Sequence, residues 1–337
     1  MGKWWCAWLN AWRRRPWFRW PWLLATSLRF LVLRGGALGD VLLTLPVLRT
    51  LQERDSSAFV ELVAPFPAAL LAPYGGAHCV ADLNSAAFLS LFVQGASLDE
   101  ALIEKLRNVD CVISYLSDPE QTISAKIKSC GCRFISGPFQ FGHRRLPASV
   151  QLAQPLAELG FVMADPTPRL VLKPRRPARM RAVFHVGSGS PAKNWPVRHW
   201  RTLAAELEGR FDELLLVSGE ADEVPTAEFL RTYRGSKLKV HSNLPILDLA
   251  HELAVAALFV GHDSGITHLA AALGTPTVAL FGPTDPLIWR PLGDHVRAVS
   301  SANGMMESLR FEPVWEVVRT LVDGSLSRTA KGEASMR

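Results

Sequence analysis

Residues 256–286 read AALFVGHDSGITHLAAALGTPTVALFGPTDP, and this stretch decides the fold of the chain. The apolar run at 257–260 predicts a buried strand, and the apolar stripe that starts at Ile266 predicts a helix, which Gly274 is placed to end. A second apolar run at 277–281 predicts the next strand. Because strand, helix and strand in this order are typical of a parallel sheet with crossover helices, the stretch predicts an α/β fold.

The loop between the first strand and the helix has the composition of an anion site. It reads His262-Asp263-Ser264-Gly265, and His268 follows one turn into the helix. A helix that starts after a parallel strand presents free N–H groups, and its dipole favours an anion. Ser264 adds a hydroxyl, and Gly265 allows close backbone approach. The alternative is that an Asp or Ser only caps the helix and that the histidine is buried in the core.

Two further loops follow predicted strands. VGSGSPAKNWP, residues 186–196, places Lys193 just before a predicted helix, and lysine is a compact cation suited to a phosphate. GGALGD, residues 35–40, ends on Asp40, a carboxylate that can take a proton from an attacking hydroxyl. A solvated lysine and a helix-capping aspartate are the alternatives. Glu220, after another apolar run, can accept hydrogen bonds from sugar or ribose hydroxyls or face water.

Two series of alternating strands and helices flank a segment rich in proline and arginine, residues 164–181, which we interpret as a linker. Each series opens with a strand, a glycine-containing loop and a helix. We therefore expect two facing Rossmann-like, doubly wound domains, at 30–163 and 182–323, with the site in the cleft between them. Residues 324–337 are small and polar and predict a disordered tail.

Several helices are predicted with definite bounds. In the first domain the patterns predict helices at 86–107 and 149–160, and the last helix of the chain is predicted at 313–322. Pro46 is expected to kink the helix after GGALGD or to mark its start.

Residues 1–29 differ in composition from the rest of the chain. They hold seven of the 11 tryptophans, six basic residues and no acidic residue, so the remainder, with 31 basic and 31 acidic residues, is neutral. A neutral body removes the electrostatic argument for nucleic acid as a partner. Tryptophan with arginine predicts a segment that lies in a membrane interface. A disordered extension and a start assigned too early are the alternatives.

The sequence predicts neither a metal nor a cofactor. The five cysteines include no CxxC pair, and no DxD pair is present to hold a metal-bridged diphosphate. The dinucleotide fingerprint GxGxxG is also incomplete, because Arg34 replaces its first glycine.

The three loops together resemble the heptosyltransferase family, inverting glycosyltransferases of the GT-B architecture that build the lipopolysaccharide inner core. The resemblance rests on RGGALGDVLLTLPVLRTL, VGSGSPAKNWP and GHDSGITHLAAALGTPTVALFGPTDP and spans about residues 30–322. It implies inverting, metal-independent transfer of a heptose or related sugar from a nucleotide-diphosphate donor, ADP-heptose above all, to a lipopolysaccharide core or similar glycan. A sugar-nucleotide epimerase or hydrolase of the same fold and a non-catalytic nucleotide-sugar-binding protein are the alternatives.

The resemblance also implies roles for individual residues. The first domain would bind the acceptor and the second the nucleotide sugar, with Asp40 as the catalytic carboxylate. Gly39, Arg144 and Arg145 are expected to contact an anionic glycolipid acceptor, with a solvated basic face as the alternative for the arginines. Such an enzyme is expected in the cytoplasm, peripheral to the inner membrane. The expected donor-binding residues are Ser188, Lys193, Glu220, Asp263, Ser264, Gly265, His268 and Thr284.

Overall fold

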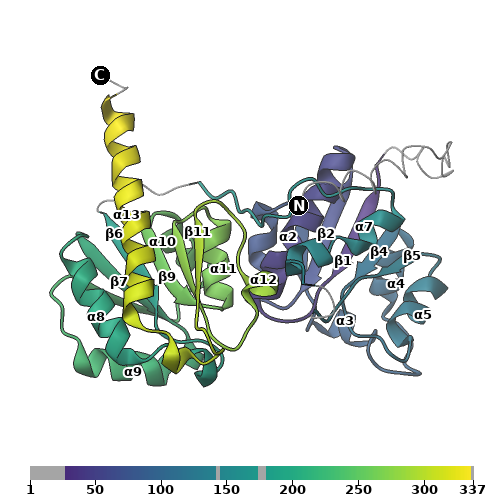
Figure 1. Ribbon diagram of the computed structural model, residues 1–337. Coiled ribbons are helices and arrows are strands. Elements are labelled where there is room, and N and C mark those ends of the chain that lie inside the picture. Colours follow the sequence, from purple (N-terminus) through teal and green to yellow (C-terminus); the bar gives the residue numbers. More distant parts are fainter. Residues whose placement is uncertain (1–26, 142–144, 174–179, 335–337) are drawn as a thin grey trace.

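A computed structural model describes residues 27–141, 145–173 and 180–334. Most of the tryptophan-rich segment, Arg144 and part of the predicted linker lie outside these residues. The described chain forms two α/β lobes that lie side by side (Figure 1). Among the described residues, no helix combines the length and the apolar character that a membrane span requires.

The first lobe is built on five parallel strands in the order β3-β2-β1-β4-β5. Alternate residues of β1 belong to two different clusters of buried side chains, so both faces of the sheet are covered. The strands are β1 (Arg29–Leu33), β2 (Phe59–Ala64), β3 (Cys79–Asp82), β4 (Cys111–Ser114) and β5 (Arg133–Ser136). The helices are α2 (Leu38–Arg54), η2 (Ala68–Tyr74), α3 (Ala86–Leu89), α4 (Glu100–Arg107), α5 (Thr122–Ser129), α6 (Ala148–Gln151) and α7 (Gln154–Glu158).

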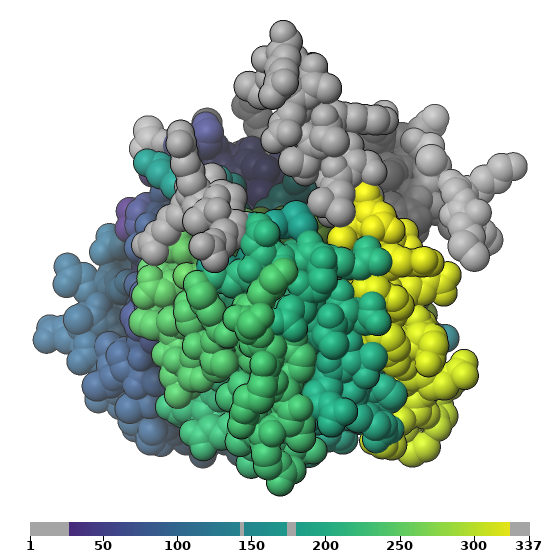
Figure 2. All heavy atoms as spheres, turned by 90° about the vertical axis from the view of Figure 1, so that its left-hand side faces the viewer, coloured from purple at the N-terminus to yellow at the C-terminus, as the bar shows by residue number. Residues whose placement is uncertain are grey.

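The second lobe is built on six parallel strands in the order β11-β10-β9-β6-β7-β8. Figure 2 views this lobe from outside, with α13 in yellow along one side. The strands are β6 (Arg181–His185), β7 (Glu213–Ser218), β8 (Leu238–Ser242), β9 (Leu258–His262), β10 (Thr277–Phe281) and β11 (Val296–Ser300). The helices are η3 (Pro191–Lys193), α8 (Val197–Glu208), η4 (Glu220–Asp222), α9 (Glu223–Thr232), α10 (Ile246–Ala254), α11 (Gly265–Ala272), α12 (Pro286–Trp289), η5 (Met306–Ser308) and α13 (Phe311–Ala334).

Both sheets are doubly wound, which confirms the predicted fold class. In each sheet the strand order reverses once, between β1 and β4 in the first and between β6 and β9 in the second. Ligands of such folds bind outside the carboxyl ends of the strands at this reversal.

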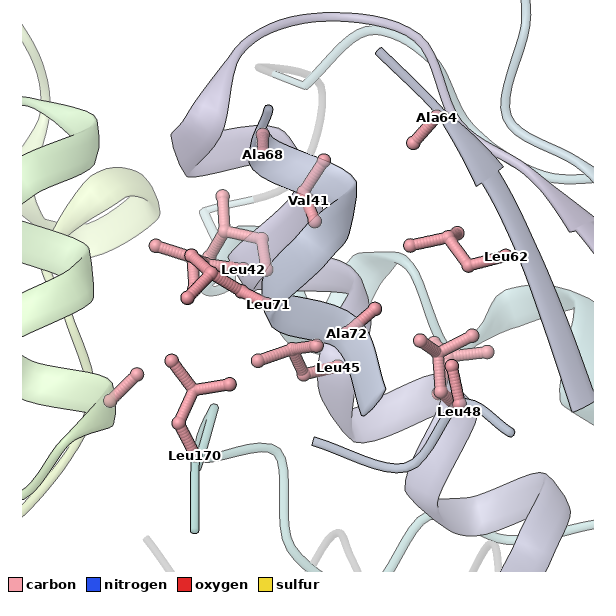
Figure 3. Close-up of a cluster of buried hydrophobic side chains, with 14 of the residues drawn as sticks. Val41, Leu42, Leu45, Leu48, Leu62, Ala64, Ala68, Leu71, Ala72 and Leu170 are labelled. Carbon is pink, nitrogen blue, oxygen red and sulfur yellow. The ribbon is translucent and has the colours of Figure 1, made fainter. Parts of the chain in front are cut away.

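Helix α2 joins the two lobes. Its residues from Val41 to Leu48 are all buried, so the helix is covered on every side, as its nearly unbroken apolar sequence requires. One face packs on the first sheet and on η2, where Leu45 and Leu71 meet, and Leu170 from the connecting segment completes this cluster (Figure 3). The same cluster continues through Leu269 of α11 into the second lobe. A continuous apolar core therefore sets the position of one lobe against the other.

Two helix predictions were wrong, and one of the two alternatives for Pro46 is excluded. The helix expected at 86–107 is two helices, α3 and α4, because Gly95 adopts a φ of +74° between them and Asp99 caps α4 with its side chain. The helix expected at 149–160 is likewise divided into α6 and α7, and Pro155 stands in the first turn of α7. Pro46 lies inside α2, which begins eight residues earlier at Leu38, so this proline does not mark the helix start.

The last helix is longer than the sequence indicated. We predicted a helix at 313–322 and a disordered tail at 324–337, whereas α13 continues to Ala334. A single glycine inside a helix costs only about 1 kcal/mol relative to alanine, and no proline follows it. Gly324 was therefore too weak a signal to end this helix.

Candidate active site

The three loops singled out in the sequence follow β1, β6 and β9, the strands at the reversal points of the two sheets. Helix α2 follows the first of these loops and α11 the third, and the two helices pack against each other. The regions outside the strand ends at the two reversal points, where ligands of such folds bind, therefore face one another. Between them lies a cavity of about 310 Å³. Its lining residues are Ala37, Gly39, Asp40, Leu43, Lys193, Asp263, Ser264, Gly265, His268, Thr284 and Trp289.

Asp40 lies in the first turn of α2 and has two fixed partners. Its Oδ1 accepts a hydrogen bond of 2.6 Å from Nη2 of Arg34, and its Oδ2 accepts one of 2.9 Å from the backbone N–H of Ala37. The carboxylate thus caps its helix and lines the cavity at once, with a third of the side chain exposed. A Cβ atom on Gly36, where φ is +90°, would lie 2.2 Å from Oδ2. Glycine at this position therefore leaves the space that the carboxylate occupies.

Arg34 was not predicted as a site residue. It is the residue after β1, its side chain is almost completely buried, and its Nε also donates to the backbone carbonyl of Asp40. Burial lowers the pKa of the Arg34 guanidinium, and the carboxylate of Asp40 opposes that shift. Since a buried arginine needs a partner, an arginine at the end of an apolar strand was itself a signal that an acidic residue lies nearby.

The opposite wall of the cavity carries a lysine that is paired with a carboxylate. Nζ of Lys193 lies 2.8 Å from Oδ2 of Asp263, and the hydroxyl of Thr284 donates to the same oxygen over 2.8 Å. Lys193 and Thr284 therefore hold the Asp263 carboxylate. Ser264 is the N-cap residue of α11 but makes no side-chain capping bond. Within the described chain, the first-turn N–H groups of α11 thus have no side-chain cap and are open to an anion.

His268 lies one turn into α11 and is 4% exposed. Burial lowers the pKa of its imidazole, and the carboxylate of Asp263 opposes that shift. Its Nδ1 has no hydrogen-bond partner among the described residues. Because the residue lines the cavity, its ring is a candidate contact for a ligand that binds there.

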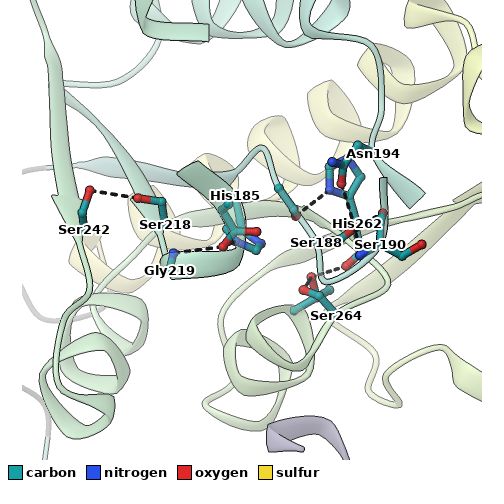
Figure 4. A network of polar contacts seen from close by, with 12 residues as sticks. His185, Ser188, Ser190, Asn194, Ser218, Gly219, Ser242, His262 and Ser264 are labelled. Carbon is teal, nitrogen blue, oxygen red and sulfur yellow. Dashed lines mark hydrogen bonds and ion pairs between the residues drawn. The ribbon is translucent and has the colours of Figure 1, made fainter. Parts of the chain in front are cut away.

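Three predicted residues do not line this cavity. Ser188 is buried, and its hydroxyl lies 2.7 Å from both the carbonyl of Ser190 and Oδ1 of Asn194, so its contacts are within its own loop (Figure 4). Glu220 is exposed at the start of η4, beyond the end of β7. Arg145 lies 3.5 Å from Asp285 of the second lobe. Arg144 is outside the described residues.

Trp289 is a further lining residue that sequence reasoning missed. It ends α12, and its ring packs edge-on against Phe141 of the first lobe, with the ring centroids 5.4 Å apart. An aromatic residue that bridges two lobes is set by tertiary packing, and its local sequence carried no signal of this contact.

Comparison with known proteins points to one family of transferases. Residues 152–315 match the family model of glycosyltransferase family 9 (heptosyltransferase). The chain is 38% identical over 104 residues to lipopolysaccharide heptosyltransferase 1 of Pseudomonas aeruginosa. It is 34% identical over 141 residues to lipopolysaccharide heptosyltransferase 1 of Escherichia coli K12.

Residues 152–315 therefore carry a glycosyltransferase family 9 (heptosyltransferase) domain. The matching stretches cover 31% and 42% of this chain, and 29% and 44% of those two relatives, so the chain spans less than half of their length.

Solved structures of glycosyltransferase family 9 extend the likeness to the whole fold. The E. coli heptosyltransferase WaaC with ADP has a TM-score of 0.69 and 19% identity, and the match covers 87% of this chain and all of that one. A family 9 structure from Veillonella parvula has a TM-score of 0.71 and 19% identity over 88% of this chain and 97% of that one. At this identity the likeness concerns the fold, and it confirms the GT-B architecture that the sequence implied.

Proposed function

We propose that this protein is an inverting glycosyltransferase that moves a heptose from ADP-heptose to a lipopolysaccharide core or a similar glycan. The observation that carries the proposal is one cavity with two unlike walls. Asp40 lies on the wall from the first lobe, and Lys193 lies with the start of α11 on the other. The solved E. coli relative was obtained with ADP and with ADP-2-deoxy-2-fluoro heptose, which supports an adenine nucleotide sugar as the donor.

The second lobe would hold the donor diphosphate. Lys193 supplies a cation, the N–H groups at the start of α11 supply hydrogen bonds, and His268 supplies a ring nitrogen. As the bond between the sugar and the diphosphate breaks, negative charge gathers on the departing ADP. Preorganised donors stabilise this charge more in the transition state than in the bound substrate, which lowers the barrier. Ser188 and Glu220 remain proposed donor residues, the first through its loop and the second at the ribose or sugar.

The first lobe would supply the base. An acceptor hydroxyl beside Asp40 attacks the anomeric carbon on the face opposite the diphosphate and passes its proton to the carboxylate. The new C–O bond forms as the old one breaks, and the electron pair leaves with ADP, so the configuration inverts. Oδ1 of Asp40 is held by Arg34, and Oδ2 has a second lone pair beside its bond to Ala37. Gly39, the residue before this carboxylate, also lines the cavity and remains a proposed acceptor contact.

Lys193 also supports transfer without a metal. Its ammonium lies 2.8 Å from Oδ2 of Asp263, and both residues line the cavity. A lysine ammonium is a compact charge that binds phosphate oxygens directly. We therefore propose that the Lys193 ammonium and the N–H groups at the start of α11 neutralise the donor diphosphate without a metal ion.

Binding of an anionic glycolipid at the cytoplasmic face of the inner membrane is a further part of the proposal. Arg145 is 74% exposed and pairs with Asp285, the residue after Thr284 of the cavity lining, and Arg144 precedes it in the sequence. The tryptophan- and arginine-rich residues 1–29 have the composition of an interfacial segment. Co-sedimentation of the full chain with anionic vesicles, compared with a variant lacking residues 1–26, tests the anchor. Equal sedimentation of the two proteins would dismiss it.

The activity itself is tested by measuring ADP release from ADP-heptose with and without a lipopolysaccharide acceptor truncated before its heptoses. A transferase releases ADP only with acceptor and attaches heptose to it. A hydrolase releases ADP from the donor alone, and an epimerase changes the sugar without acceptor. Either of these results would overturn the proposal, as would ADP-heptose binding without any turnover.

A further inference from the structure

His262, the last residue of β9, bonds both ends of the loop that carries Lys193. The side chain is fully buried. Its Nε2 lies 2.8 Å from the backbone N of Trp195, and its Nδ1 lies 2.9 Å from the carbonyl oxygen of Gly187. We call residues 187–195 the lysine loop. Figure 4 shows His262 beside this loop.

These two contacts determine which nitrogen of the His262 imidazole carries the proton. A backbone N–H can only donate, so Nε2 of His262 accepts from Trp195 and carries no proton. Nδ1 therefore carries the proton and donates to Gly187. Burial lowers the pKa of this imidazole to about 3, although the nearby carboxylates of Asp222 and Asp263 raise it and His185 lowers it further. The ring is neutral at physiological pH, with a donor on one side and an acceptor on the other.

The lysine loop is a compact unit with its own internal bonds. The hydroxyl of Ser188 lies 2.7 Å from Oδ1 of Asn194, and the backbone N–H of Lys193 donates to the carbonyl of Ser190 over 2.9 Å. These bonds hold the loop's shape but do not attach it to the sheet. His262 makes that attachment, and the next residue, Asp263, contacts Nζ of Lys193. At the end of β9, His262 thus attaches the loop to the sheet, and Asp263 supplies the negative charge beside Lys193.

The end of the loop has a second anchor. The indole N–H of Trp195 donates to the carbonyl of Leu309 over 2.7 Å, and the ring is buried against Trp200. Loss of the His262 ring would leave this anchor in place. The lobe should therefore stay folded while the segment from Gly187 to Asn194 loses its fixed position.

We propose that His262 is a positioning residue that holds the lysine loop so that the Lys193 ammonium lies over the start of α11. Its ring is enclosed behind the loop and does not reach the cavity, whose lining does not include it. The consequence for donor binding rests on the proposed function, whereas the attachment of the loop does not.

A double-mutant cycle on ADP binding tests the proposal. His262→Leu removes both bonds, while His262→Gln keeps a donor and an acceptor on one side chain. We expect His262→Leu to weaken ADP binding by about tenfold or more, because the charge-assisted hydrogen bond from Lys193 to the diphosphate would lose its alignment. We expect His262→Gln to restore most of that loss. In the Lys193→Ala background, His262→Leu should cause no further loss of ADP affinity.

His295→Leu is the matched control. Nε2 of His295 also bonds a backbone carbonyl, that of Ala271, at the end of α11 remote from the cavity. This variant should leave ADP affinity unchanged. Unchanged ADP affinity in folded His262→Leu, or equal losses with and without Lys193, would overturn the proposal.

Amide hydrogen exchange without ligand separates the attachment of the lysine loop by His262 from the binding of the donor at Lys193. In His262→Leu, the amides from Gly189 to Asn194 should exchange faster than in the wild type, and in His295→Leu they should not. If the wild type binds no ADP but exchange quickens, the donor assignment fails and the positioning role of His262 stands. If the wild type binds ADP but exchange in the loop is unchanged in His262→Leu, the positioning role of His262 is wrong and the donor assignment stands.

Discussion

Gly265 of α11 lies in direct contact with Gly39 of α2, across the junction of the two lobes. A Cβ atom on Gly265 would lie 3.0 Å from the backbone N of Gly39 and 2.8 Å from Cβ of Leu38. The donor helix and the helix that carries Asp40 therefore approach each other backbone to backbone. Because α2 is buried on all sides, it cannot move away without disturbing the core.

Gly265→Ala should lower kcat because the added methyl group forces the starts of the two helices apart. Overpacking of this kind typically costs about 1–3 kcal/mol of folding free energy, so the variant should also be less stable. Steady-state kinetics and urea unfolding measure the two effects. Gly209→Ala is the control, since a Cβ atom there meets only Glu206 O at 3.9 Å, far from the cavity. A Gly265→Ala enzyme with wild-type kcat would contradict the contact.

Asp40→Asn should abolish most transfer while sparing donor binding. The amide keeps the size of the carboxylate but cannot take a proton, and general base catalysis contributes about 10²–10⁴ in rate. Calorimetry should give an ADP affinity close to that of the wild type. The assay is heptose transfer to the truncated acceptor, and Asp294→Asn, at an exposed carboxylate outside the cavity lining, is the control. Near-normal turnover by Asp40→Asn would remove Asp40 from the mechanism.

Arg34→Lys should lower kcat without changing the KM for ADP-heptose. Lysine keeps the charge but cannot donate at once to Oδ1 and to the backbone carbonyl of Asp40, as Nη2 and Nε of Arg34 do. Loss of a hydrogen bond to a charged group typically costs about 1.5–3 kcal/mol, so thermal unfolding should shift as well. A raised KM with unchanged kcat would show that Arg34 acts on donor binding instead.

EDTA should leave the transfer rate unchanged, because we propose that Lys193 and the α11 start neutralise the diphosphate alone. Lys193→Ala should weaken ADP binding, and added Mg²⁺ should not restore it. Rates measured in EDTA and in Mg²⁺, for the wild type and this variant, check both statements. Loss of wild-type activity in EDTA that Mg²⁺ reverses would show that transfer needs a metal.

Acid should destabilise the protein through His262. The folded pKa of this group is about 3, whereas an unfolded histidine titrates near about 6.5. Below about pH 6.5 the unfolded chain binds a proton that the folded chain does not, so the free energy of unfolding falls as pH decreases, by up to about 1.4 kcal/mol per pH unit. The contribution is fully present above about pH 6.5. His262→Gln should show a shallower decline than the wild type in urea unfolding at pH 7.5, 6 and 5; equal slopes would contradict the assignment.

The sequence by itself determined the fold class and the loops on which the chemistry lies. Strand and helix periodicity is local, and the carboxyl ends of parallel strands share one edge of a sheet, so residues after β6 and β9 had to face a common region. The loop after β1 was expected opposite them because the cleft between two such sheets is where their ligands bind. That reasoning selected Asp40, Lys193 and the start of α11, and all three line one cavity.

Only the tertiary structure decided which atoms those residues contact. Asp40 pairs with Arg34, Lys193 with Asp263, and His262 with both ends of the lysine loop. Ser188 bonds within its own loop, and Trp289 reaches the cavity from α12. Such pairings depend on the packing of elements distant in the chain, and α2 brings the two lobes together only because its apolar residues are buried on every side. Local pattern therefore determined where the site lies, and long-range packing determined its partners.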